Sequence, residues 1–432
     1  MRQADFAAAL TKASWTAQSA ATLGHDLARA MQIARSARPG PVHVSLPLDV
    51  LDQRIEANRS LWPEAAAAAA RPMPLAGRTA DLIHAEIRAA KRPLVLCGPT
   101  LCSERGRESM QQLERITSVP VVGMESPRGV NDPSLGAFAE VLAQADLIVL
   151  LCKPLDFTLR FGDAPHVAAD CSWIVVDPDP DLLARATRHK KEHVVLSAMA
   201  GPSEAMNALL ARPRESDHRS TAWLEYARAA LSYRPAEWKN LQSGTNGPVH
   251  PVELGRALQA FLDRHAEAIL VCDGGEIGQW LQATLSAKKR LINGVAGSIG
   301  SSLPFALAAQ AANPGQPVVA VMGDGTFGFH MAEFDTAVRC GLPAIVVIGN
   351  DARWNAEYQI QVRDYGRSRV HGCELLASRY EKVAEALGGH GEYVTKASEL
   401  DAALDRALRS GKPACINVIV EAVAAPVMRR AK

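Results

Sequence analysis

The sequence predicts an α/β protein with parallel sheets: a Rossmann-like central domain, a second parallel-sheet domain after it and a short α/β segment before it. Three observations predict this class. Apolar runs such as DLIVLLC and VVAVM lack the alternation of half-buried strands, so both faces of their sheets are expected to be covered. Helical spans separate these runs, as in strand–helix–strand units. Compact turns rich in glycine and aspartate follow two of the runs, as at ligand-binding strand ends.

The first 63 residues predict a helix followed by a strand. Residues 6–38 carry alanine, leucine and methionine at helical spacing, and Pro39-Gly40-Pro41 breaks this pattern before the strand VHVSLP. Residues 64–78 read EAAAAAARPMPLAGR, a composition typical of a connector between domains. We therefore place the first domain boundary there and assign residues 1–63 to the N-terminal segment.

Residues 79–211 predict the Rossmann-like central domain. Apolar strands are expected at 93–97, 119–124, 146–152, 173–179 and 193–197, with helices near 104–117 and 135–144. The polar stretch 212–246 predicts a second connector that contains one helix, around residues 223–233.

Residues 247–432 predict another parallel α/β domain. A helix is expected over 250–264, then the strand AILVC at 268–272, the loop DGGEIGQW, and the strands VVAVM at 318–322 and AIVVI at 344–348. The unit is expected to close near residue 424.

Charge and composition exclude several classes of function. The 432 residues of the chain include 47 basic and 46 acidic residues, which give a formal net charge of +1. This balance predicts neither nucleic-acid binding nor attachment to a membrane surface. No apolar run is long enough to span a bilayer, and the start MRQADFAAALTKASW lacks the apolar core of a secretory signal, so we expect a cytoplasmic protein. The eight scattered cysteines, without a C-x-x-C pair, predict small buried side chains in a reducing compartment.

Two acidic turns predict a metal site. Asp324 lies in Gly323-Asp324-Gly325 after one apolar strand, and Asp351 follows the next apolar strand along the chain, 27 residues later. Parallel strands bring their carboxyl ends to one edge, so both carboxylates and the Arg353 carbonyl could bind one Mg²⁺ beside a phosphate group. An isolated Gly-Asp-Gly is usually only a tight turn. The paired second turn favours the metal site instead.

The segment GDGTFGFHMAEFDTAVRCGLPAIVVIGND resembles the thiamine-diphosphate signature of the family that contains acetolactate synthases, benzaldehyde lyase and oxalyl-CoA decarboxylase. The resemblance extends to NGVAGSIGSSLPFALAAQAANPGQPVVAVMGDG, ARPGPVHVSLPLDV and PLDFTLRFG, and covers nearly the whole chain. It implies a diphosphate- and Mg²⁺-binding domain at residues 247–432. It also implies that residues 1–63 are the last part of the domain that binds the aminopyrimidine.

The resemblance also implies roles for individual residues. Asp324, Asp351 and the Arg353 carbonyl would bind Mg²⁺. Ile299 would prop the cofactor into its bent shape, although ordinary core packing is the alternative interpretation of this side chain. The cofactor would be contacted by the three-residue loop after AILVC, by the segment around Ile299 and by the first acidic turn, namely Gly274, Gly275, Glu276, Gly297, Ser298, Ile299, Gly323, Gly325 and Thr326.

Two departures from the family pattern stand out. Asp351 occupies a position that is usually Asn, which adds a negative charge, and Asn350 is a second candidate ligand if the turn is shifted by one residue. The family also uses a glutamate, on an N-terminal domain, that activates the cofactor. About one hundred residues of that domain are expected to be missing here, and the first glutamate is Glu56, outside the required context, so no activating acid is assigned.

Several other residues have two interpretations. His330 could act as an acid or base near the cofactor or serve a structural role, and Trp354 and Tyr358 could line a substrate pocket or pack in the core. Glu333 and Asp335 could orient a ligand, but solvated or capping roles are commoner. The turn at Asp177 is similar to one that meets an adenine nucleotide in some relatives. No G-x-G-x-x-G accompanies it, so the sequence supports binding of FAD or ADP only weakly.

The expected function is thiamine-diphosphate- and Mg²⁺-dependent decarboxylation and carboligation of 2-oxo acids, as in acetolactate synthase. Carbon–carbon lyase or acyl-CoA decarboxylase activity of the same family is an alternative, and a non-catalytic homologue that binds cofactor weakly or not at all is another. A nicotinamide oxidoreductase would require a glycine fingerprint where this chain has CGPTLCSERG. The resemblance implies a homodimer or homotetramer acting on a small carbonyl substrate.

Overall fold

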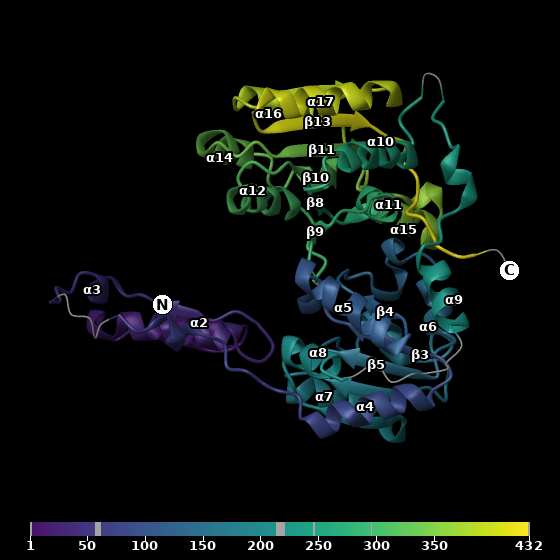
Figure 1. Ribbon diagram of the computed structural model, residues 1–432. Helices are drawn as coiled ribbons and strands as arrows, with labels where there is room; N and C mark the ends of the chain where they lie inside the picture. Colours follow the sequence, from purple (N-terminus) through teal and green to yellow (C-terminus); the bar gives the residue numbers. More distant parts are fainter. Residues whose placement is uncertain (1, 57–61, 213–220, 245–246, 295, 431–432) are drawn as a thin grey trace.

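Two large parallel sheets follow one another along the chain in the computed structural model, which describes residues 2–56, 62–212, 221–244, 247–294 and 296–430 (Figure 1). Within these residues the C-terminal sheet contains six strands, in the spatial order β12 (His390–Val394), β13 (Ala414–Ile419), β11 (Ile345–Asn350), β10 (Val318–Gly323), β8 (Ile269–Cys272) and β9 (Lys289–Ile292). The chain passes from β8 outward to β9 and returns to β10 on the other side of β8. The strand order therefore reverses between β8 and β10, where sheets of this type bind ligands.

Helices cover both faces of the C-terminal sheet, as the unalternating strands predict. One apolar core joins the sheet to α10 (Pro251–Arg264), α11 (Gly275–Thr284) and α17 (Leu400–Ser410). The other joins it to α12 (Ser302–Ala312), α13 (Asp324–Phe327), α14 (Glu333–Cys340) and α16 (Tyr380–Ala386). The remaining helix, α15 (Asn355–Tyr365), follows β11. The prediction that DGGEIGQW forms a loop is wrong. Its last six residues form the start of α11, and only its first two residues precede the helix.

The central sheet has five parallel strands among the described residues, in the order β4 (Val121–Gly123), β3 (Pro93–Cys97), β5 (Leu147–Leu151), β6 (Ser172–Val176) and β7 (Val194–Ala198). All five sequence-predicted strands are present; β3 has the predicted ends, and the ends of the other four are shifted. One face is covered by α6 (Phe138–Leu142), α7 (Pro180–Lys190) and α9 (Ala222–Leu231). The opposite face is covered by α4 (Gly77–Ala89), α5 (Glu104–Thr117) and α8 (Pro202–Leu210).

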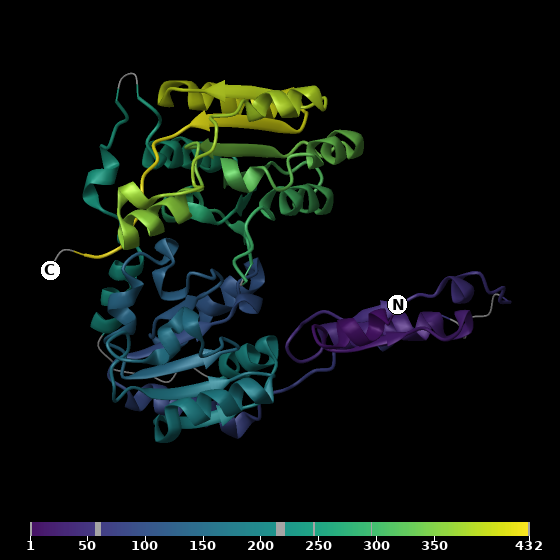
Figure 2. The ribbon, with the colours of Figure 1, turned by 180° about the vertical axis from the view of Figure 1, so that it is seen from behind.

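The N-terminal segment extends away from the two large sheets (Figures 1 and 2). It contains α1 (Gln3–Ala8), β1 (Ser14–Thr16), α2 (Leu23–Arg35), β2 (His43–Ser45) and α3 (Leu48–Leu51), and its two strands pair in parallel. The expected helix followed by a strand is present as α2 and β2, but β1 interrupts the helical pattern of residues 6–38, so a continuous helix there is wrong. The run SWT instead pairs with His43–Ser45, because this partner strand, distant in sequence, supplies the hydrogen bonds that β1 needs.

Candidate functional site

Three neighbouring strands of the C-terminal sheet bring the predicted site residues together. In the sheet β10 lies between β8 and β11, and Gly323 at the end of β10 is in register with Gly349 near the end of β11. Asp324 follows β10 directly and Asp351 follows β11, so both acids leave the sheet at the same edge. Gly274 follows β8 at this edge too.

A cavity of 240 Å³ opens at this edge. It is lined by eleven of the twelve predicted site residues: Gly274, Gly275, Glu276, Gly297, Ile299, Gly323, Asp324, Gly325, Thr326, Asp351 and Arg353. The twelfth, Ser298, does not line the cavity. Its carbonyl accepts a hydrogen bond from the Ser301 hydroxyl instead. Arg128, which follows β4 in the central sheet, also lines the cavity and was not predicted, because its contact joins segments far apart in sequence.

The two acids affect each other's charge. Burial raises the pKa of Asp324 to about 6. Burial, followed by the negative charge of Asp324, raises the pKa of Asp351 to about 7. The backbone amide of Arg353 interacts with both carboxylates, so the side chains converge on one place. The negative charge of Asp324 opposes the ionisation of Asp351, and a cation bound near both carboxylates would relieve this repulsion.

The arrangement fits a bound divalent cation. Asp324 Oδ1 accepts a 2.9 Å hydrogen bond from the Gly325 amide, but its Oδ2 is buried with no hydrogen-bond partner among the described residues. A buried carboxylate oxygen without a partner is costly, and a metal ion would satisfy it. No cluster of three or more His, Cys, Asp or Glu side chains suited to a metal occurs in the described part of the chain. Any Mg²⁺ would therefore need backbone carbonyl, water or phosphate oxygens as well.

Asn350, the alternative ligand, points away from the cavity. Its amide nitrogen donates to Asn417 Oδ1 and to the Ser378 carbonyl, both at 3.1 Å, and its Oδ1 accepts from the Ala352 amide. Its side chain is buried in the sheet and all of its polar atoms have partners. The turn is therefore not shifted, and Asp351 is the residue that lines the cavity.

Glycines allow backbone to line the cavity closely. Gly275 begins α11 with φ +74°, a conformation that other residues rarely adopt, and this helix end faces the cavity. A Cβ at Gly325 would lie only 2.7 Å from the Trp354 ring. Amides at a helix N-terminus and around such glycines are suited to bind a phosphate group.

Asp273 organises the site, although the sequence did not point to it. This fully buried residue accepts hydrogen bonds from the backbone amides of Gly274, Gly300 and Ser302. It thereby ties the loop that carries Ile299 to the end of β8. An acid directly after a buried strand was the available signal, but its partners lie 27 and 29 residues away.

Ile299 lies at the cavity and not in the core. Its exposed fraction is 36%, and the Cβ of a side chain at Gly274 would come within 3.0 Å of its Cγ2 atom. The interpretation of Ile299 as an ordinary core residue is therefore wrong.

The other candidates divide into cavity residues and structural ones. Trp354 lines the cavity, whereas Tyr358 lies beneath the Arg353 guanidinium, 4.4 Å from its ring centre. His330 Nδ1 lies 2.9 Å from the Gly300 carbonyl, to which it donates, as expected of a structural histidine. Glu333 and Asp335 do not line this cavity, and Asp335 pairs with Arg339 on the surface of α14.

Glu276 of α11 and Arg128, which follows β4, both line the cavity. Burial raises the pKa of Glu276, while the charge of Arg128 acts in the opposite direction. Glu276 Oε2 accepts hydrogen bonds from the Ala425 amide at 2.9 Å and from Gln279 at 3.1 Å.

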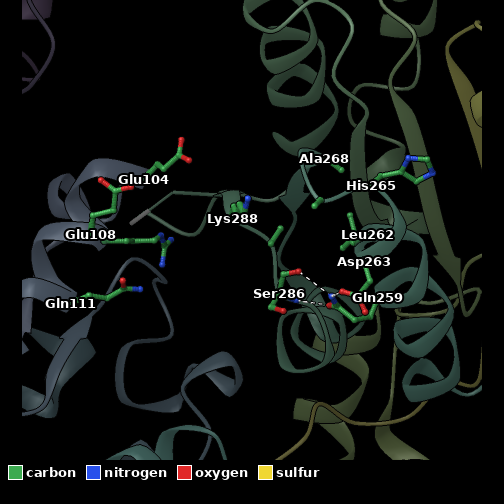
Figure 3. A pocket seen from close by; sticks show the side chains of 13 residues that line it. Glu104, Glu108, Gln111, Gln259, Leu262, Asp263, His265, Ala268, Ser286 and Lys288 are labelled. Atoms are coloured by element: carbon green, nitrogen blue, oxygen red, sulfur yellow. Dashed lines mark hydrogen bonds between the residues drawn. The ribbon is translucent and has the colours of Figure 1, made fainter.

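A larger cavity lies elsewhere, between the two sheets. Its volume is 680 Å³, and Figure 3 shows Glu104, Glu108 and Gln111 of α5 on one side and residues of α10 on the other. It contains none of the predicted site residues, and its walls mix acidic and basic side chains without converging on one point. The smaller cavity is the better candidate because polar groups and shifted pKa values gather there.

Comparison with known proteins agrees with this geometry. Residues 273–418 match the family model of the thiamine pyrophosphate enzyme C-terminal TPP-binding domain. The chain is 33% identical over 427 residues to the acetolactate synthase large subunit IlvG of Mycobacterium tuberculosis, an alignment that covers 96% of this chain and 75% of that protein. The chain belongs to the thiamine-diphosphate-dependent enzymes.

Two further relatives share less sequence identity with the chain. The chain is 25% identical to 2-hydroxyacyl-CoA lyase of Arabidopsis thaliana, over 96% of this chain and 75% of that protein. It is 26% identical to oxalyl-CoA decarboxylase of Escherichia coli strain K12, over 96% of this chain and 74% of that protein. Membership of this family identifies the chain as an enzyme.

Three further expectations concern a nucleotide at Asp177, the state of the cysteines and membrane-spanning helices. Asp177 is buried and pairs with Arg38 at 3.3 Å, so its carboxylate already has a partner other than a nucleotide. Seven of the eight cysteines are buried as expected, whereas Cys340 is exposed, and all eight are free. Among the described residues, the search for a helix long and apolar enough to cross a bilayer found none.

Proposed function

We propose that the chain is a Mg²⁺- and thiamine-diphosphate-dependent 2-oxo acid decarboxylase and carboligase, similar to acetolactate synthase. The observation that carries this proposal is the pair formed by the buried Asp324 and the partly buried Asp351. Their raised pKa values and the unpartnered Asp324 Oδ2 support a cation between them. A divalent ion bound there would neutralise the diphosphate of the cofactor.

Each lining residue has a role in this proposal. Asp324, Asp351 and the Arg353 carbonyl would hold Mg²⁺, while amides near Gly275 and Thr326 would bind the diphosphate. The Gly297 carbonyl would accept from the aminopyrimidine, and Ile299 would support the bent cofactor. Glu276, Gly274, Gly323 and Gly325 would complete the wall.

The residues around the cavity position reactants and exclude water. When bound, thiamine diphosphate supplies a nucleophilic carbon and an electron sink for decarboxylation. Ile299 and Trp354 would keep the reacting region apolar, which strengthens electrostatic interactions inside it. None of the described residues is assigned here as the acid that activates the cofactor.

The choice of 2-oxo acid chemistry rests on similarity. IlvG is 33% identical to the chain, against 25% and 26% for the two enzymes that act on CoA thioesters. Carbon–carbon lyase or acyl-CoA decarboxylase activity is the second candidate, supported by the same alignments at lower identity.

The proposal extends to domains and assembly. Residues 1–63 would be the end of the pyrimidine-binding domain, 64–78 and 212–246 linkers, 79–211 the central domain and 247–432 the diphosphate- and Mg²⁺-binding domain. We infer a homodimer or homotetramer in the cytoplasm, as the resemblance implies.

A product assay tests the proposed reaction. The 432-residue chain with thiamine diphosphate and Mg²⁺ should convert pyruvate to carbon dioxide and acetolactate, and Asp324→Ala should abolish this conversion. Turnover of oxalyl-CoA or a 2-hydroxyacyl-CoA instead of pyruvate would favour the second candidate. Cofactor binding without turnover of any of these substrates would favour a non-catalytic homologue.

A further inference from the structure

A second chamber adjoins the proposed cofactor cavity. It has a volume of 230 Å³ and shares Gly274, Gly275, Gly297, Ile299 and Arg128 with that cavity. Its remaining walls are Ser126 and Pro127 from the central domain and the polar side chains Gln279, Gln282 and Asn293. The acids Asp324 and Asp351 line only the first cavity, so the chamber lies to one side of the proposed metal site.

Asn293 lines this chamber with an amide that has no partner. Its exposed fraction is 6%, and no side-chain hydrogen bond links it to another residue in the described ranges. Its Nδ2 atom lies 2.8 Å from the position that a Cβ at Gly274 would take, so the amide reaches to the boundary between chamber and cavity. The amide atoms of Asn293 are not among the fully buried, unpartnered atoms of the described residues, so they remain accessible from the chamber that the residue lines. A ligand with hydrogen-bonding oxygens could accept from this amide.

Arg128 supplies the positive charge of the chamber. Its guanidinium is exposed and makes no hydrogen bond or ion pair within the described part of the chain. Glu276 is the acid on which its charge acts, but Glu276 Oε2 already accepts from Ala425 and Gln279. The five N–H groups of Arg128 are therefore available for a planar anion.

The turn that presents Arg128 is fixed on both sides. Before it, Glu125 pairs with Arg107 of α5 at 2.9 Å and with Arg290 of β9. After it, Gly129 adopts φ +56°, and a Cβ there would lie 2.0 Å from the Thr158 carbonyl oxygen. Within it, the Ser126 hydroxyl accepts from the Arg128 amide. Such a turn fixes the backbone that carries Arg128, so ligand binding has to order only the exposed side chain.

We propose that Arg128 and Asn293 bind the carboxylate of the 2-oxo acid substrate in this chamber, and this inference rests on the proposed function. A guanidinium forms two parallel hydrogen bonds to a carboxylate, and the Asn293 amide can donate a third. The chamber suits a small acid, since its walls carry polar groups but not the metal-binding acids. Arg128 would be a specificity-determining residue for acids over neutral carbonyl compounds.

The test is calorimetric titration with oxamate, an unreactive isostere of pyruvate, in the presence of thiamine diphosphate and Mg²⁺. Wild-type protein should bind oxamate and should not bind its uncharged methyl ester. Arg128→Gln should weaken oxamate binding about ten- to hundredfold, the size expected for losing hydrogen bonds to a charged group. Arg128→Lys, which keeps the positive charge but not the planar guanidinium, should lose less oxamate affinity than Arg128→Gln.

Matched controls separate a local effect from a global one. Arg105→Gln removes the same charge from an exposed position on α5 that lines neither chamber nor cavity, and should leave oxamate affinity unchanged. Asn293→Ala alters a buried position, so its melting temperature is measured alongside its affinity. The exposed Arg128 variants keep the test decisive if Asn293→Ala does not fold.

The outcomes distinguish this inference from the proposed function. If wild-type protein binds the cofactor with Mg²⁺ but Arg128→Gln binds oxamate as tightly as wild type, the carboxylate site is wrong and the proposed function stands. Failure of wild type to bind oxamate likewise overturns the site. A tenfold loss of cofactor affinity in Arg128→Gln would assign Arg128 to the cofactor instead and overturn the inference. Failure of wild type to bind thiamine diphosphate would overturn the proposed function itself.

Discussion

At the scale of single residues, the site is defined by two acids that destabilise the metal-free protein. In the unfolded chain both carboxyl groups have the ordinary aspartate pKa of 3.8, but in the folded chain the pKa of Asp324 rises to about 6 and that of Asp351 to about 7. Between pH 4 and pH 7 the folded protein therefore holds protons that the unfolded chain has lost. Stability must fall as pH rises through this window.

Substitution of Asp351 tests this coupling. In Asp351→Asn the charge that opposes Asp324 is gone, so the metal-free melting temperature should fall less between pH 5 and pH 8 than in wild type. Scanning fluorimetry without divalent ions measures the difference. Asp335→Asn, which removes a surface acid, is the control and should keep the wild-type slope. Equal slopes in Asp351→Asn and wild type would contradict the coupling.

A second residue-scale prediction concerns Asp273. Asp273→Ala would leave the Gly300 and Ser302 amides buried without acceptors, at a cost of about 3 kcal/mol in the free energy of unfolding. Urea denaturation measures this cost. The free energy of unfolding of Asp273→Asn, which keeps one acceptor oxygen, should lie between those of wild type and Asp273→Ala. An alanine variant as stable as wild type would show that the loop does not depend on this carboxylate.

Sequence reasoning at this scale identified residues that follow strands and missed those defined by distant contacts. Asp324 and Asp351 could be predicted because each ends a strand. Arg128, Asn293 and Asp273 could not, since their importance comes from the approach of segments far apart in the chain. Ser298 was predicted to contact the cofactor but does not line the cavity, since neighbouring residues in a loop can point in different directions.

At the scale of elements, α11 packs closely on the strand ends beneath it. A Cβ at Gly349 of β11 would lie 2.4 Å from Ile277 Cγ1 of this helix. The central strands and β8, β10 and β11 could be predicted from their apolar patterns, whereas β9, β12 and β13 were not among the expected strands. The start of α11 was taken for a loop because its glycines are poor helix formers, and packing against β10 and β11 overrides that preference.

Gly349→Ala tests this close approach. The added methyl should push α11 from the sheet, lower the free energy of unfolding by about 1–3 kcal/mol and weaken cofactor binding, since α11 carries Gly275 and Glu276. Thermal unfolding and titration with thiamine diphosphate measure the two effects. Gly244→Ala, where the nearest atom is 3.9 Å from the new Cβ, should change neither. A stable Gly349→Ala with normal cofactor affinity would refute the account.

At the scale of the whole molecule, charged groups join the two sheets. Arg290 of β9 in the C-terminal sheet pairs with Glu125 after β4 of the central sheet, and both side chains are largely buried. Arg234 adds a link by donating to the carbonyls of Ala283 and Ser134. The two sheets could be predicted separately from sequence. How they meet could not, because ion pairs between distant segments leave no local pattern.

The Arg290–Glu125 pair should be costly to break from one side. Arg290→Leu should lower the free energy of unfolding by up to about 3 kcal/mol, because Glu125 would keep only Arg107 as a partner. The double variant Arg290→Leu/Glu125→Leu should recover most of the loss, as a double-mutant cycle by urea denaturation would measure. Additive losses would show that the pair does not couple the two sheets.

The central claim, a cation held by Asp324 and Asp351 that anchors thiamine diphosphate, is tested most directly by calorimetric titration of the cofactor with and without Mg²⁺. Wild-type protein should bind one thiamine diphosphate per site only when Mg²⁺ is present, and Asp324→Ala should lose this binding while remaining folded. Equally tight binding without Mg²⁺, or in Asp324→Ala, would contradict the account.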